Sequence, residues 1–229
     1  MKIVITCEHA TNAIPPEYVY LFEEQKDVLN THEGYDPGAY DLYKYLEPLS
    51  NASYAQDIGR LLIETNRSLH HPKLYSRFSK NLEHSKKSEI IAERYLPYRQ
   101  YVENLILDIQ KFNQTVLHLS IHSFTPVLDN IERNCDIGIL YDPKVRLEQE
   151  WSEQFKRSLT NKSKYRVRKN YPYYGKADGF TTYLRKRFTE NYIGIEIEVN
   201  QKFVSRNIMN ESMKETIYKS IKLCIKKAP

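Results

Sequence analysis

The feature of this sequence that most constrains its fold is the alternation of short apolar runs with longer amphipathic segments. The runs have strand length and many β-branched residues: Lys2–Cys7, Ala52–Gln56, Arg60–Glu64, Val116–His122, Asp136–Tyr141, Tyr165–Lys169 and Tyr192–Val199. Strands that alternate with helices along a chain are typical of proteins built on a largely parallel sheet. We therefore predict an α/β fold, a three-layer α/β/α sandwich with a mixed, largely parallel central sheet.

The segments between these runs carry helix signals. In "DPGAYDLYKYLEPL" (36–49), Asp36 stands where an N-cap is expected and Pro37 at the first helical position. A long helix is predicted over 88–112, kinked or restarted near Pro97. The polar segment Ser68–Lys87 is predicted to be a functional loop. Further helices are predicted at Lys144–Leu159, Thr181–Phe188 and Asn210–Lys226.

The length and composition predict one domain over residues 1–229. The chain has no repeat and no linker-like segment, and its 41% hydrophobic and 28% charged residues are ordinary for a globular protein. No apolar run reaches the ~18 residues of a membrane span. The apolar start, "KIVIT", is too short for a signal peptide. We therefore expect a cytoplasmic protein that does not enter a membrane.

The charges and cysteines limit the possible partners and sites. The net charge of +5 is mild, and the basic stretches "KSKYRVRK" and "KLCIKKAP" are short. Nucleic-acid binding would need basic residues gathered on one face, so we favour a small anionic substrate, and the oligomeric state is left open. Cys7, Cys135 and Cys224 lie far apart with no CxxC pair, which indicates neither disulfides nor a thiolate zinc site. We expect Cys7 to be a buried structural thiol rather than a nucleophile.

Reactive side chains follow several predicted strands at the point where each strand ends. His9 follows the first strand, Asn66 and Arg67 follow "LLIE", His122 closes "VLHLSIH", and Glu198 lies in "IGIEIEVN". Ligands of open α/β sheets bind beyond the carboxyl ends of the strands, so these residues are predicted to form one active site. No GxSxG, Walker, GxGxxG or HExxH motif is present, which disfavours the enzyme classes that use them.

Dispersed histidines and carboxylates are the ligand set of catalytic zinc (Zn²⁺), which keeps one position open for water. His9 and His122 are the natural imidazole ligands. A zinc hydrolase also needs a separate general base, and Arg67 could hold a substrate carboxylate through two hydrogen bonds. From the residues alone, the third ligand stays open between Glu8, Glu33, Asp36 and Glu198.

Seven blocks of the sequence, in this order and between residues 3 and 204, resemble the N-formylglutamate amidohydrolase family. They are "CEHATNAIPPEY", "THEGYDPGAYDL", "IETNRS", "SIHSFTPVL", "RNCDIGILYDP", "NYPYYGKADGFTTYLR" and "IGIEIEVNQ". That family is similar to the zinc carboxypeptidase-like enzymes, so the resemblance implies a zinc-exopeptidase-like α/β/α sandwich.

The resemblance also implies roles for individual residues. His9 and His122 would be metal ligands, and Asp36 would be the third, because Asn12 stands where the related enzymes have a glutamate. Glu198 would be the general base, with Glu196 as the alternative. The residues implied to bind or cover the substrate are Asn66, Arg67, Arg133, Tyr173, Gly175 and Asp178.

The activity implied by the resemblance is zinc-dependent hydrolysis of the linear amide of an N-acyl amino acid. N-formyl-L-glutamate, cleaved to glutamate and formate, is the best single candidate substrate. Two alternatives remain at this point. One is a zinc carboxypeptidase or cell-wall-peptide amidase on the same scaffold, and the other is a non-catalytic relative that binds a small molecule.

Overall fold

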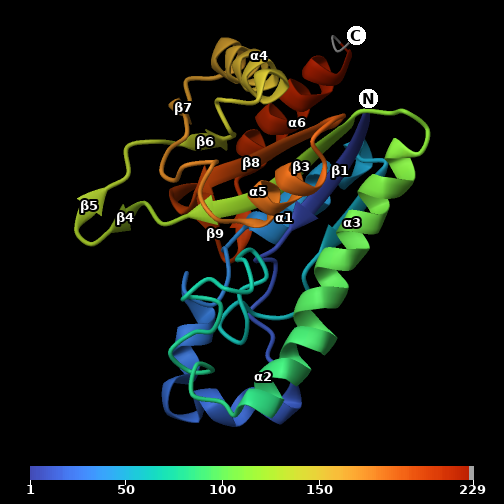
Figure 1. Ribbon diagram of the computed structural model, residues 1–229. Coiled ribbons are helices and arrows are strands. Elements are labelled where there is room, and N and C mark those ends of the chain that lie inside the picture. The colour runs from blue at the N-terminus through green and yellow to red at the C-terminus, as the bar shows by residue number, and fades with distance from the viewer. Residues whose placement is uncertain (227–229) are drawn as a thin grey trace.

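A six-stranded mixed sheet forms the centre of the protein in the computed structural model, which describes residues 1–226 (Figure 1). Four neighbouring strands, β2, β1, β3 and β8, run parallel, whereas β6 is antiparallel to β8 and β7 is parallel to β6. In sheet order the strands are β2 (Ala52–Ala55), β1 (Lys2–Cys7), β3 (Val116–Phe124), β8 (Tyr192–Asn200), β6 (Ile137–Leu140) and β7 (Val167–Lys169).

Helices cover both faces of this sheet. The larger apolar core joins one face to α1 (Ala39–Leu46), α4 (Arg146–Lys162) and α6 (Glu211–Lys226). A smaller core joins the other face to α3 (Leu96–Gln110) and α5 (Phe180–Arg187). The predicted α/β sandwich with a mixed, largely parallel sheet is therefore confirmed.

The helix α6 shows how the sequence pattern sets this arrangement. Its buried residues Met213, Ile217, Ile221 and Cys224 recur every three or four positions, so they form one stripe on the helix. This stripe belongs to the larger core, and α6 packs against both α4 and α1. Burial of each such side chain contributes roughly 1.5–3 kcal/mol, which holds the helix in place.

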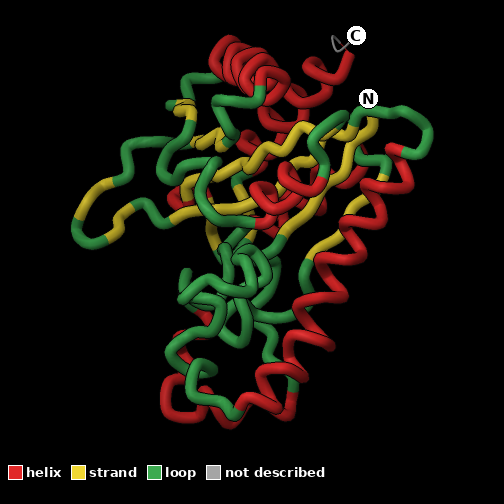
Figure 2. Tube along the Cα trace, in the orientation of Figure 1, coloured by secondary structure: helices red, strands yellow, loops and turns green. Residues whose placement is uncertain are grey.

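A lobe of turns and short helices lies beyond the carboxyl ends of the parallel strands (Figure 2). It contains η1 (Pro16–Asn30), a long irregular stretch over 56–83 and α2 (His84–Ile90). The lobe has its own small apolar clusters, which include Tyr18, Phe22, Leu61, Leu62 and Ile63. The segment Ser68–Lys87, predicted to be a functional loop, lies in this lobe. It is irregular as far as Glu83, and its last four residues form the start of α2.

Two expectations for this region were wrong. Arg60–Glu64 is not a strand but a series of turns, and its apolar residues pack inside the lobe instead of the sheet. A short apolar run does not by itself distinguish a strand from another buried segment.

Asp36 does not cap α1, which begins at Ala39 after Gly38 in a left-handed conformation (φ 76°). The Asp36 side chain instead contacts two histidines of the site described below.

The predicted long helix is continuous from α2 to α3, and a π-helical segment, η3 (Ile91–Tyr95), joins the two. Pro97 lies in the first turn of α3, directly after this wider segment, so the helix continues past the proline without a break. No helix among the described residues is long and apolar enough to span a membrane. The small elements not predicted are η2 (Glu47–Leu49), β4 (Val127–Leu128), β5 (Ile131–Glu132), η4 (Gln201–Phe203), β9 (Val204–Ser205) and β10 (Ile208–Met209).

Candidate metal centre and active site

The carboxyl ends of three adjacent parallel strands meet at one edge of the sheet. In the ladder between β3 and β8, His122 lies opposite Glu198, and β1 continues directly into Glu8 and His9. A cavity of 320 Å³ opens at this edge, lined by residues of both the strand ends and the lobe, and we call it the strand-end cavity. Its lining residues are His9, Asp36, Arg60, Glu64, Asn66, Arg67, His122, Ser123, Pro172, Tyr173, Tyr174, Ala177, Asp178, Glu196 and Glu198.

Three buried side chains point their donor atoms at one another in this cavity. The Asp36 Oδ2 atom lies 3.2 Å from His9 Nδ1 and 3.0 Å from His122 Nδ1, and the two Nδ1 atoms are 3.2 Å apart. Donor atoms at ~2.0–2.1 Å from a tetrahedral zinc ion are roughly 3.3 Å from each other. The triangle of two imidazole nitrogens and one carboxylate oxygen therefore fits one face of a zinc coordination tetrahedron.

The second nitrogen of each imidazole is held by a carboxylate. His9 Nε2 lies 2.6 Å from Glu64 Oε1, and His122 Nε2 lies 3.1 Å from Glu8 Oε2 and 2.8 Å from the Ser120 hydroxyl. Carboxylates in this position fix the orientation and raise the basicity of histidines that bind metals. This arrangement leaves both Nδ1 atoms directed at the cavity, as a metal site requires.

The electrostatics of the cluster reflect these contacts. Burial alone would lower the pKa of His122, but hydrogen bonds to Asp36 and Glu8 raise it well above its usual value. Burial would likewise raise the pKa of Glu8, but the hydrogen bond and charge of His122 bring it far below the usual range. Glu8 is therefore ionised, as a carboxylate that fixes the orientation of the His122 ring must be.

Two residues of the cluster were not among the predicted site residues. Glu64 contacts His9, and Arg60 donates from Nε to Glu64 Oε2 at 2.7 Å and from Nη1 to Asp36 Oδ1 at 3.3 Å. Both belong to the segment predicted as a strand, Arg60–Glu64, and for that reason neither was predicted as a site residue. The available signal was a carboxylate immediately before the "TNRS" segment, four residues after an arginine.

The alternative third ligands occupy different environments. Glu8 contacts the Nε2 side of His122, away from the three clustered donor atoms. Glu33 forms an exposed ion pair with Arg77. Among the residues that the structure describes, the only group of metal-binding side chains that comes together is His9, Asp36 and His122.

Glu198 lines the same cavity beside the metal cluster. It is buried, and within residues 1–226 its Oε2 atom has no hydrogen-bond partner. Burial raises the pKa of Glu198 to about 8. Glu196 also lines the cavity but accepts a hydrogen bond from Thr181 Oγ1. A buried carboxyl group with a perturbed pKa and a free oxygen is suited to proton transfer.

The turn that contains Asn66 and Arg67 is tied to the start of α5. Asn66 Oδ1 accepts from the backbone N–H of Phe180 at 2.7 Å, and Arg67 Nη1 donates to the carbonyl oxygen of Asp178. The Asp178 carboxylate in turn accepts from the backbone N–H of Ser68 at 3.0 Å. Asn66, Arg67 and Asp178 thus form one wall of the cavity, with Arg67 as its basic side chain.

The other predicted binding residues differ in position. Tyr173 lines the cavity, and Arg133 donates to its hydroxyl at 3.0 Å without lining the cavity itself. Gly175 lies in the middle of the loop formed by residues 170–179, where an added Cβ would come within 2.1 Å of the backbone nitrogen of Tyr141. Arg133 and Gly175 therefore support the loop over the cavity, whereas Tyr173 faces it.

A second glycine fixes the path of the same loop beside Glu198. Gly138 is the partner of Glu198 in the ladder between β6 and β8. An added Cβ at Gly138 would lie 2.2 Å from the carbonyl oxygen of Tyr171 and 3.2 Å from the Glu198 Cβ. The backbone at Tyr171 therefore lies directly on the sheet, which brings the following residues over the cavity.

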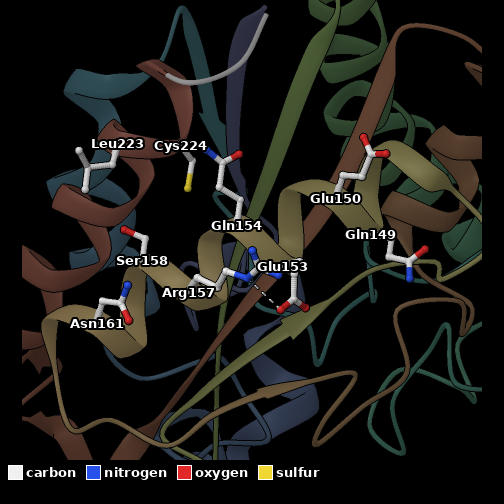
Figure 3. Close-up of a pocket in the computed structure, with 9 residues that line it drawn as sticks. All are labelled: Gln149, Glu150, Glu153, Gln154, Arg157, Ser158, Asn161, Leu223 and Cys224. Atoms are coloured by element: carbon white, nitrogen blue, oxygen red, sulfur yellow. Dashed lines mark ion pairs between the residues drawn. The ribbon is translucent and has the colours of Figure 1, made fainter.

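A different hollow of 630 Å³ lies between α4 and α6 (Figure 3). It has no histidine in its lining, which comes from α4 and α6 alone, and its charges include an ion pair between Arg157 and Glu153 at 3.4 Å. These are helix-surface residues with no convergent donor set. The lining comprises Gln149, Glu150, Glu153, Gln154, Arg157, Ser158, Asn161, Leu223 and Cys224. The strand-end cavity is therefore the candidate active site.

Comparisons with known proteins identify the family and support the fold of this chain. The family model described as N-formylglutamate amidohydrolase matches residues 1–205, which include every residue of the strand-end cavity. A gene product of Agrobacterium tumefaciens has a similar structure (TM-score 0.85, 22% identity, 98% of this chain and 90% of that chain covered). The N-formylglutamate amidohydrolase of Ralstonia eutropha is also similar (TM-score 0.69, 15% identity, 98% and 93% covered). The search of curated proteins found no match.

Proposed function

Because the chain belongs to the N-formylglutamate amidohydrolase family, we propose that it is a zinc-dependent enzyme that hydrolyses N-formyl-L-glutamate to glutamate and formate. The observation that carries this proposal is the position of Glu198 beside the triangle of His9, Asp36 and His122. A hydrolytic metal site needs three protein ligands and a separate proton acceptor within reach. The strand-end cavity offers both.

The chain's own residues would hold the metal in a fixed position. The donors would be the Nδ1 atoms of His9 and His122 and the Oδ2 atom of Asp36. Glu64 and Glu8 would keep the two rings in place through their Nε2 atoms. When bound, zinc would supply a Lewis acid that polarises the scissile carbonyl group and activates water.

Glu198 would move the proton in this reaction. Its free carboxylate oxygen accepts a proton from the attacking water, and the new C–O bond forms at the formyl carbon. Glu198 then donates this proton to the amide nitrogen as the C–N bond breaks, so that glutamate leaves as an amine. Its pKa of about 8, raised by burial, means that the ionised form, which accepts the proton, is a minor fraction at neutral pH and grows as the pH rises towards 8.

Arg67 would bind a carboxylate of the amino acid. Arg60 is the other arginine of the cavity, and it is already engaged by Glu64 and Asp36. Arg67 makes its side-chain hydrogen bond to a backbone carbonyl instead, so its charge is available to a substrate. Asn66 lies beside it and would complete the contact.

Removal and restoration of the metal tests the proposal. Treatment with a chelator should abolish hydrolysis of N-formyl-L-glutamate, and stoichiometric zinc should restore it. Formate release and metal content by mass spectrometry are the measurements. Undiminished activity in zinc-depleted protein would exclude a metal-dependent reaction. A protein that binds zinc but hydrolyses no N-acyl amino acid would be a binding relative, not an enzyme.

Arg99 is predicted to position the substrate-binding turn without contact to the substrate. It is buried and donates to the carbonyl oxygens of Thr65 at 3.0 Å and Arg67 at 3.3 Å. Its guanidinium lies 4.4 Å from the ring centres of Phe180 and Tyr183, and within residues 1–226 it forms no ion pair. Arg99 thus connects the turn to α5 through backbone contacts and aromatic stacking.

We expect Arg99→Met to raise KM for N-formyl-L-glutamate by roughly tenfold or more, with a smaller change in kcat. The reason is that a displaced Arg67 weakens substrate binding, whereas the metal cluster and Glu198 stay in place. Arg99→Lys should recover part of the loss. Arg94→Met removes a more exposed arginine that pairs with Glu17 and serves as the control. A loss of activity that is confined to kcat, with KM unchanged, would contradict a positioning role.

A further inference from the structure

A second cavity adjoins the strand-end cavity and opens outward from it. Its volume is 580 Å³, and we call it the outer cleft. Both cavities are lined by Asp36, Arg60, Arg67 and Tyr173, so they are adjacent at the metal cluster. The strand-end cavity alone is at the lower end of the ~300–1,000 Å³ that small-molecule sites occupy. A small N-acyl amino acid would fill it and leave the outer cleft vacant.

The walls of the outer cleft differ in character. The lining includes the basic residues Lys73 and Arg77 from the lobe and two exposed apolar side chains, Leu128 of β4 and the ring of Tyr173. Arg77 is neutralised by Glu33. The Lys73 side chain forms no ion pair with any residue in the described part of the chain, so its charge is uncompensated. The outer cleft thus combines an apolar surface with one free ammonium group.

The relative position of the two cavities suggests how a bound N-acyl amino acid would be oriented. Asn66 and Glu198 line only the strand-end cavity, whereas Lys73 and Leu128 line only the outer cleft. If the amino acid's carboxylate is bound at Asn66 and Arg67, the scissile bond lies at the metal cluster and the acyl group points outward. A formyl group has no chain that could enter the outer cleft.

We propose that the outer cleft is an acyl-chain subsite that recognises a short methylene chain ending in a carboxylate. The chain's methylene groups would pack against Leu128 and the ring of Tyr173, and its carboxylate would pair with Lys73. This inference rests on the proposed function, because it uses the orientation of the amino acid. It predicts that N-dicarboxylic-acyl amino acids are substrates in addition to N-formyl-L-glutamate.

N-succinyl-L-glutamate and N-butanoyl-L-glutamate test this subsite. Both have four-carbon acyl groups on ordinary amides, and they differ in the terminal carboxylate. With the zinc-loaded full-length protein, kcat/KM should be roughly two- to fivefold higher for the succinyl compound, the size expected of an exposed ion pair. Lys73→Met should remove this preference. Lys80→Met, which alters an exposed lysine of the same segment outside both cavities, should preserve it.

The same two ligands, titrated calorimetrically into Glu198→Gln protein with and without Lys73→Met, separate binding from catalysis. Tighter binding of the succinyl compound that depends on Lys73 supports the subsite even if no substrate is hydrolysed, in which case only the proposed function fails. Hydrolysis of N-formyl-L-glutamate with equal values for the succinyl and butanoyl compounds overturns the subsite and leaves the proposed function intact. Equal binding of both compounds also overturns it.

Discussion

His122→Ala is expected to lower kcat/KM for N-formyl-L-glutamate by at least about a thousandfold and to remove most of the bound zinc. His122 supplies one of three donor atoms, and two donors do not hold zinc in a catalytic geometry. The metal is worth several kcal/mol of transition-state stabilisation, and each ~1.4 kcal/mol is tenfold in rate. Steady-state kinetics and metal analysis of the purified variant give the two readouts.

A matched control is available for this experiment. His84 is an exposed histidine at the start of α2 and does not line the strand-end cavity, so His84→Ala should keep both zinc and activity. Circular dichroism should be used to check that His122→Ala is folded, because the removed ring takes one buried partner from Glu8 and one from Asp36. Retention of full zinc content and activity by the folded variant would mean that the metal binds elsewhere.

Glu198→Gln is expected to reduce kcat by roughly 10²–10⁴-fold while zinc content stays at the wild-type level. The amide keeps the size of the side chain but cannot accept the proton of the attacking water. Because Glu198 is not one of the three clustered donors, its loss should not release the metal. Pre-steady-state and steady-state kinetics on the zinc-loaded variant would locate the loss in the chemical step.

Glu196→Gln provides the comparison for this variant. Glu196 lines the same cavity, but its carboxylate is already bound by Thr181. We expect its replacement to cost far less in kcat than that of Glu198. If Glu198→Gln turned over normally and Glu196→Gln lost activity, the general base would be Glu196, and Thr181 would be its hydrogen-bond partner during the reaction.

The sheet and its helices could be predicted from sequence because they follow regular periodicities. Lys2–Cys7 was predicted with its observed bounds, and the helix from Asn210 was correct to within one residue. The error at Arg60–Glu64 has a physical reason. Its buried side chains fill a lobe whose shape depends on contacts with η1 and α2, distant in sequence, and local periodicity does not encode such contacts.

The sequence allowed more to be inferred about which residues lie together at the strand ends than about the contacts between them. Parallel strands bring their carboxyl ends together, so the grouping of His9, His122 and Glu198 followed from the sheet. The contacts of Glu64 and Arg60 could not be inferred, because the lobe positions them through irregular backbone. Gly175 was expected to close over the substrate, but it packs against Tyr141, a role that depends on three-dimensional proximity alone.

Gly138 has a consequence for attempts to change the specificity of this protein. The backbone at Tyr171, in the root of the 170–179 loop, packs directly on Gly138, which is also the ladder partner of Glu198. The root of this loop and the Glu198 side chain are therefore both positioned by Gly138. Mutant libraries that vary the root would disturb both together. Variation confined to the side chains of Tyr173, Tyr174 and Ala177 would change the shape of the cavity wall and leave the contact between Tyr171 and Gly138 intact.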